Sequence, residues 1–168
     1  MGQFTNKILA EFQPPKKWKL GRDLVYTTTD LYANEVKALK DVGVEIVRDT
    51  NKTETITVPT GFITDLASTP RLLWNVIAPF DVARAAIVHD LLYKAIRTYR
   101  WKKGALDEDK ELIANAKKAS DKVFHLAMKD ADPKVSGWKI YSAWKAVDLF
   151  GRWSIICLLY TSPSPRDS

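Results

Sequence analysis

VARAAIVHDLLYKAIRT, residues 82–98, is a mostly apolar stretch that predicts a helix, and it carries polar groups where packing alone would place aliphatic residues. Adjacent residues of a helix differ by about 100° in direction, whereas residues four apart share a face. His89 and Tyr93 are therefore predicted to point to one side, with Asp90 beside them. An imidazole, a phenol and a carboxylate within one turn suit the activation of water. The alternative is a buried His–Asp pair that is hydrogen-bonded only for stability.

Two more helices are predicted after this one. The first spans about residues 107–130, and the second spans about 134–152, opened by Asp132-Pro133 as an N-cap and a first-turn proline. Helices joined by a short linker pack antiparallel, so Asp121 in the middle of the first is expected to reach His89. The residues expected on the buried side of the last helix are Trp138, Tyr141, Ala143, Trp144, Val147 and Phe150.

The N-terminal third has the patterns of strands and turns. Alternating or β-branched residues predict strands at 17–28, 44–48 and 53–58, with a possible edge strand within 4–12, a short helix at 30–40 and an ordered apolar loop at 60–71. The turn-rich link at 49–52 predicts that the strands flanking it pair as a hairpin. The fold class is therefore α+β: a small antiparallel sheet (about 17–58), then a three-helix half with two antiparallel helices that carry the polar groups.

The end of the chain is predicted not to be native. Residues 157–167 match the translation of one reading frame of a common transposase sequencing adapter. We therefore expect one domain over residues 1–156, a read-through tail over 157–168, and a natural chain that continues past Ile156. The only cysteine, Cys157, lies in this tail, so neither a disulfide nor thiolate chemistry is expected in residues 1–156.

Charge alone discriminates little between partners. The chain carries a formal net charge of +6, but its basic residues are scattered rather than gathered in one stripe. Basic surfaces attract phosphate, whether in nucleic acid or in anionic lipid. Nucleic-acid binding rests on charge alone and is therefore the weakest of the functions considered. Neither a signal peptide nor a run as long as a membrane span is recognisable.

The polar positions together suggest a catalytic site. A carboxylate such as Asp121, hydrogen-bonded to one imidazole nitrogen, fixes the tautomer and leaves the other nitrogen to accept a proton from water. Asp90 and Asp65, with backbone carbonyls of the Asp65-Leu66 loop, are candidate oxygen ligands for calcium, which would polarise an ester carbonyl or a phosphoryl oxygen. Considered alone, each aspartate has a simpler interpretation. Asp65 would be a turn-capping carboxylate, and Asp121 would be a charge on a helix surface that pairs with a lysine. His125 is the alternative imidazole and is expected to be an ordinary surface or boundary histidine.

Two motifs carry a resemblance to a family. VPTGFITDLASTPR at 58–71 and AAIVHDLLY at 85–93, with Asp121, Phe124 and AVDLFG at 146–151, resemble an uncharacterised family that is common in tailed phages and prophages. The resemblance covers roughly residues 17–151. It implies a phage or prophage origin, a location in the host cytoplasm or the virion, and other phage proteins as partners. It implies no activity.

A second, more distant resemblance does imply an activity. A helix bearing His-Asp-x-x-Tyr, packed against a second helix bearing an aspartate, is similar to the catalytic core of secretory and bacterial phospholipases of the A-two class. The roles that this resemblance implies are His89 as the base, Asp121 as the carboxylate behind it, Tyr93 as hydrogen-bonding support, Asp90 as a calcium ligand, and Asp65 with the Leu66 carbonyl as the upstream calcium site. The chain departs from that pattern in having Leu92 where a cysteine is common and in lacking a glycine-rich calcium loop.

Together, the residues and the resemblances favour a phage-encoded, metal-assisted hydrolase of phospholipase-like architecture. Its substrate would be a lipid or another ester, its cofactor calcium, and its partner a phospholipid or membrane surface. The alternative is a non-enzymatic virion or tail-assembly protein in which the His–Asp cluster is structural. The two hypotheses make different structural predictions. Only the hydrolase requires that His89, Asp90, Asp121 and Asp65 converge on a solvent-accessible cleft.

Overall fold

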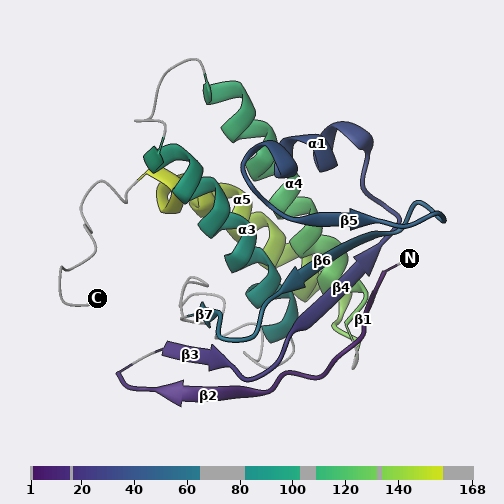
Figure 1. Ribbon diagram of the computed structural model, residues 1–168, viewed down its shortest axis with the longest axis vertical. Coiled ribbons are helices and arrows are strands. Elements are labelled where there is room, and N and C mark those ends of the chain that lie inside the picture. Colours follow the sequence, from purple (N-terminus) through teal and green to yellow (C-terminus); the bar gives the residue numbers. More distant parts are fainter. Residues whose placement is uncertain (1, 16, 65–81, 103–108, 132–133, 157–168) are drawn as a thin grey trace.

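The computed structural model describes residues 2–15, 17–64, 82–102, 109–131 and 134–156 (Figure 1). Asp65 and Leu66, the rest of the loop expected up to residue 71, and the tail 157–168 lie outside the described residues. So do Asp132 and Pro133, which the sequence predicts as a helix start. The described elements confirm the α+β class, with short antiparallel strands followed by long helices.

The described strands form two small antiparallel sheets. Their bounds are β1 (Gln3–Phe4), β2 (Ala10–Gln13), β3 (Lys17–Leu20), β4 (Leu24–Thr28), β5 (Ile46–Arg48), β6 (Glu54–Val58) and β7 (Ile63–Thr64). One sheet has the order β1-β4-β6-β5 and the other the order β2-β3-β7. The predicted β5–β6 hairpin is present, with Ile46 opposite Ile56. The antiparallel strands are as predicted, and β1 and β2 overlap the segment 4–12 where an edge strand was expected, but the strands belong to two sheets instead of one.

The segment 17–28 divides at a corner instead of forming one strand. β3 ends at Leu20 and β4 begins at Leu24, and the two belong to different sheets. The Gly21 amide donates to the Leu9 carbonyl, at 2.8 Å. The Asp23 carboxylate accepts hydrogen bonds from the amide and the hydroxyl of Thr60, each at 2.7 Å. These contacts with distant segments fix the corner, and alternation along the sequence does not reveal them.

One face of the four-stranded sheet carries the core residues. In the β4–β6 pair, Leu24 lies opposite Val58 and Tyr26 lies opposite Ile56. Directly opposed residues of antiparallel strands share a face, and all four of these side chains are buried. Helix α3 (Ala83–Lys102) packs against this face through contacts with β4 and β6 (Figure 1). The sheet thereby provides the support on which α3 is placed.

The described helices are α1 (Ala33–Asp41), α3 (Ala83–Lys102), α4 (Lys110–Lys129) and α5 (Gly137–Ile156). α4 packs against α1, α3 and α5, and α3 and α4 run antiparallel, as predicted (Figure 1). α1 begins three residues later than predicted, where the Glu35 carboxylate accepts a hydrogen bond from the Tyr32 amide at 2.8 Å. α5 begins at Gly137, not at residue 134. None of these described helices is long and apolar enough to cross a membrane.

The buried stripe of α5 differs from the prediction. Ala143 and Val147 are buried as predicted, but Trp138 and Tyr141 are 61% and 57% exposed. Ile140, which the prediction omitted, is buried. Ile140, Ala143 and Val147 are three and four residues apart and so share one face of the helix. The prediction was therefore wrong for Trp138 and Tyr141, which lie off this face, whereas Trp144 is half-buried and packs against the core. The side chain of Phe150 lies outside the described ones.

A hydrogen bond joins the sheet to the end of α4. The Tyr26 hydroxyl donates to the Asp130 carboxylate at 2.8 Å, and burial raises the pKa of Tyr26 above its usual value. We expect Tyr26→Phe to destabilise the protein by about 1 kcal/mol, because it removes one hydrogen bond from a partly buried acceptor. Urea unfolding measures this loss. Tyr141→Phe, which removes a hydroxyl from an exposed ring, is the matched control and should change stability by less than about 0.5 kcal/mol.

Candidate functional site

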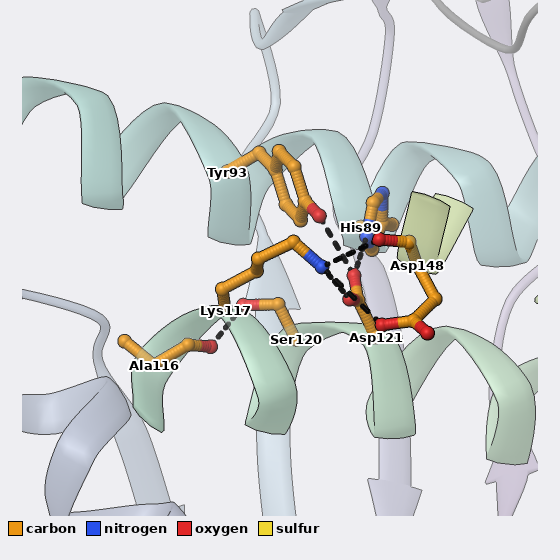
Figure 2. A network of polar contacts seen from close by, with 7 residues as sticks. All are labelled: His89, Tyr93, Ala116, Lys117, Ser120, Asp121 and Asp148. Atoms are coloured by element: carbon orange, nitrogen blue, oxygen red, sulfur yellow. Dashed lines mark hydrogen bonds and ion pairs between the residues drawn. The ribbon is translucent and has the colours of Figure 1, made fainter. Parts of the chain in front are cut away.

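A cluster of polar side chains lies where α3, α4 and α5 meet (Figure 2). It consists of His89 and Tyr93 from α3, Lys117 and Asp121 from α4, and Asp148 from α5. His89 and Tyr93 share a face of α3 because they are four residues apart. Lys117 and Asp121 share a face of α4 for the same reason. The antiparallel packing of α3 on α4 sets these two faces against each other.

Asp121 is the centre of the cluster. Its Oδ1 lies 3.1 Å from His89 Nε2 and accepts a hydrogen bond from the Tyr93 hydroxyl at 2.8 Å. Its Oδ2 accepts a hydrogen bond from Lys117 Nζ at 2.6 Å. The predicted contact between Asp121 and His89 is therefore present. Both carboxylate oxygens have partners, which offsets the cost of burying the charge.

The environment of Asp121 favours its ionised form. Burial alone raises the pKa of this carboxyl, but the hydrogen bonds and charges of His89 and Lys117 outweigh it and bring the pKa below the ordinary value. Burial and the negative charge of Asp121 raise the pKa of Tyr93. Tyr93 therefore remains a phenol that donates, and Asp121 remains a carboxylate that accepts.

The His89 ring is held in one orientation by its neighbours. Its centroid lies 4.1 Å from that of Tyr93 and 4.9 Å from that of Phe124. Because Nε2 faces Asp121, Nδ1 lies on the other edge of the ring. No described residue forms a hydrogen bond with Nδ1, and 13% of the His89 side chain is exposed. One edge of the imidazole is thus fixed by a carboxylate, and the other is left for a different partner.

Lys117 and Asp148 complete the cluster, although neither was among the predicted site residues. Lys117 is a buried lysine, and its Nζ also lies 3.4 Å from the backbone oxygen and 3.7 Å from Oδ1 of Asp148. It thereby links α4 to α5. The signal in the sequence was the lysine four residues before Asp121, a spacing that places both on one helix face. The expectation that Asp121 pairs with a lysine is correct, but the pair is buried rather than on the surface.

The proposed calcium ligands are not gathered among the described residues. Asp90 lies on α3 outside the Asp121 cluster, with its Oδ1 3.7 Å from Arg97 Nη2. Asp65 and Leu66, the other predicted ligands, lie outside the described residues. Within the described ranges, no group of three or more His, Cys, Asp or Glu side chains is arranged to hold a metal ion. Asp90 is therefore the only predicted metal ligand that the structure describes.

His125 is separate from the cluster, as expected for a boundary histidine. It is half-buried on α4, and its ring meets that of Trp144 edge-on at a centroid distance of 5.5 Å. Burial, helped by the positive charge of Lys129, lowers the pKa of His125. The lowered pKa favours the neutral form of this histidine near pH 7. None of the contacts described for His125 is with a carboxylate.

Comparison with known proteins gives a family. Residues 41–147, more than half of the chain, match the model of the family described as "Protein of unknown function (DUF1353)". The chain belongs to this family. The match includes His89, Tyr93, Lys117 and Asp121, whereas Asp148 falls one residue beyond it. No curated protein and no solved structure matches the chain. The expected membership of an uncharacterised family is thus confirmed, and the family description assigns no activity.

Proposed function

We propose that this DUF1353 protein is a phage-encoded ester hydrolase of phospholipase-like architecture, in which His89 activates a water molecule. The observation that carries the proposal is the arrangement at Asp121. One oxygen of this carboxylate lies within hydrogen-bonding distance of both His89 Nε2 and the Tyr93 hydroxyl. A carboxylate placed behind an imidazole is the arrangement that general-base catalysis needs. The phage origin rests on the sequence motifs at 58–71 and 85–93.

The proposed reaction uses the nitrogen of His89 that does not face Asp121. Nδ1 takes a proton from water as the water oxygen attacks the ester carbonyl carbon. The resulting imidazolium is stabilised by Asp121, which stays ionised because Lys117 and His89 lower its pKa. When the tetrahedral intermediate collapses, the bond between carbon and the leaving oxygen breaks. Nδ1 then returns the proton to that oxygen, so the products are an acid and an alcohol and His89 is again neutral.

The proposal includes calcium held by Asp90, Asp65 and the Leu66 carbonyl. Asp90 follows His89 directly on α3, so the two residues are neighbours along the helix. When bound, the ion would supply a Lewis acid for the carbonyl oxygen. Arg97 near Asp90 acts against this part of the proposal, because a guanidinium disfavours a second cation on the same carboxylate.

Calcium is expected to raise the thermal stability of the protein. A ligand that binds only the native state stabilises it by RT ln(1 + [L]/Kd), about 2.7 kcal/mol at a ligand concentration of 100 Kd. Asp90→Asn should abolish the shift, because it removes an anionic oxygen at nearly constant volume. Differential scanning calorimetry with millimolar calcium, with magnesium as the comparison ion, measures the effect. An unchanged melting temperature of the parent protein would exclude the calcium part while leaving a metal-free hydrolase open.

The test of the activity is hydrolysis by the purified protein. A fluorogenic phospholipid in vesicles and a set of short-chain esters should be presented with and without calcium, and the acid and alcohol products identified by mass spectrometry. We expect hydrolysis of at least one lipid ester above the rate of the vesicles alone. If the parent protein hydrolyses none of these esters, the proposed activity is wrong.

One observation favours a second candidate, a non-enzymatic virion or tail-assembly protein. Tyr93, Lys117 and Asp121 are buried, and Lys117 links α4 to α5 by a contact that any helical protein can use to fix its packing. In this case Asp121 joins α4 to α3, Lys117 joins α4 to α5, and His89 takes part in no reaction. The two candidates predict opposite results for substitution of His89, described in the Discussion.

A further inference from the structure

A groove lies on the other side of α3, away from the Asp121 cluster. It has a volume of about 420 Å³ and is open to solvent. α3 forms one wall of the groove, and the turn between α1 and β5 forms another. Phe62, which directly precedes β7, also lines the groove. Its lining includes Val42, Phe62, Leu91, Lys94, Ala95 and Lys102. Its volume is within the range of sites that bind small molecules.

The groove is separate from the proposed active site. Leu91, Lys94, Ala95, Thr98 and Lys102 form one stripe along α3, because they are three or four residues apart. At 100° per residue, this stripe is directed about 180° away from His89 and Tyr93. A molecule in the groove would therefore not reach the His89 imidazole, and occupation of the groove does not depend on the proposed hydrolase activity.

The walls of the groove are apolar, and its charge is mainly positive. Phe62 and Val42 are largely buried beneath it, and Leu91 and Ala95 add aliphatic surface. Lys94 Nζ lies 5.0 Å from the centre of the Phe62 ring. The acidic residue Asp41 is already paired with Lys37 at 2.6 Å. Two lysines, Lys94 and Lys102, therefore set the sign of the electrostatic potential at this groove.

We propose that this groove binds a single-chain amphipathic carboxylate, of the chemical class of a free fatty acid. Lys94 and Lys102 are eight residues apart, about 12 Å along the helix axis, so the apolar surface between them has room for an extended alkyl chain. The carboxylate would pair with one of the two ammonium groups at the end of that surface. Among the described lining residues, Thr98 and Tyr99 are the uncharged polar side chains, too few to satisfy a ligand with many hydrogen-bonding groups such as a nucleotide.

Calorimetric titration with dodecanoate and with dodecyltrimethylammonium tests the sign of the charge. The two probes have the same alkyl chain and opposite charges. The parent protein should bind dodecanoate below its micelle-forming concentration and should bind the cation at least about tenfold more weakly, because the lysines repel it. Equal binding of the two probes, or no binding of dodecanoate, would overturn the proposal.

Three variants locate the site. Lys94→Glu should weaken dodecanoate binding at least about tenfold, because it reverses the charge beside Phe62. Ala95→Phe should weaken it too, by filling the groove. Lys118→Glu is the matched control, since it changes the net charge equally at an exposed position of α4 away from the groove, and it should leave binding unchanged. Equal losses in Lys94→Glu and Lys118→Glu would show that net charge, not the groove, binds the probe.

A measurement on the parent protein covers the case in which a variant does not fold. Dodecanoate should shift the backbone amide NMR signals of Gly43, Ala95 and Thr98 and leave those of His89 and Asp121 unshifted. Shifts at the exposed Trp138 and Tyr141 of α5 in place of the groove would reject this site. The result is independent of hydrolysis, so failure of the proposed activity would not affect it.

Discussion

His89→Gln is expected to keep the fold and to lower ester hydrolysis by about 10²- to 10⁴-fold, the usual contribution of a general base. The fold should persist because a glutamine amide can still donate to Asp121. Hydrolysis should fall because an amide cannot accept a proton from water at neutral pH. Melting temperature and initial rate, measured on the same preparations, separate the two effects.

The control for this variant is the other histidine. His125→Gln alters a half-buried imidazole on α4 that lies outside the Asp121 cluster, so the hydrolysis rate should stay within about twofold of the parent value if general-base catalysis resides at His89. A structural role for His89 predicts the reverse pattern. The substitution would then destabilise the protein by about 1 to 3 kcal/mol, because glutamine lacks the ring that packs against Tyr93 and Phe124, and there would be no activity to lose.

Lys117→Met is expected to destabilise the protein by about 3 to 5 kcal/mol, the usual cost of removing one partner of a buried ion pair. The substitution leaves Asp121 as a buried carboxylate without its ammonium partner, and it also removes the contact with Asp148 on α5. Chemical denaturation in urea measures the loss. The double variant Lys117→Met/Asp121→Asn should recover part of it, since no uncompensated charge remains buried.

The chain contains a matched control for this prediction. Lys37 and Asp41 on α1 form a pair with the same spacing of four residues and the same 2.6 Å distance, but their side chains are 76% and 39% exposed. The corresponding values for Lys117 and Asp121 are 9% and 5%. Lys37→Met should therefore cost only about 0.3 to 0.5 kcal/mol. Similar losses in the two lysine variants would contradict a special role for the buried pair.

The same pair predicts how stability depends on pH. The pKa of Asp121 is lower in the folded protein than its ordinary value of 3.8. A carboxyl with a depressed pKa contributes stability above the unfolded pKa and loses it as the pH falls through the folded one. The parent protein should therefore lose stability below about pH 4. Lys117→Met should show a smaller loss over that range, because the lysine no longer favours the charged form.

The sequence alone determined the local geometry of the candidate site. His89 and Tyr93 had to share a face once residues 82–98 formed a helix, because the repeat of 3.6 residues is a property of the backbone. The short linker before the next helix made it possible to predict that Asp121 meets His89, and the two lie 3.1 Å apart. The α+β class and the hairpin around residues 49–52 followed from equally local patterns.

Tertiary structure decided what becomes buried. Lys37–Asp41 and Lys117–Asp121 have the same spacing, yet only the second pair is covered, because α3 and α5 pack over that face of α4. The division of residues 17–28 into strands of two sheets depends on a contact with Thr60, distant in sequence. Periodicity gives each side chain a direction relative to its own element, whereas burial and charge pairing depend on which other elements pack there, and this is a property of the assembled chain.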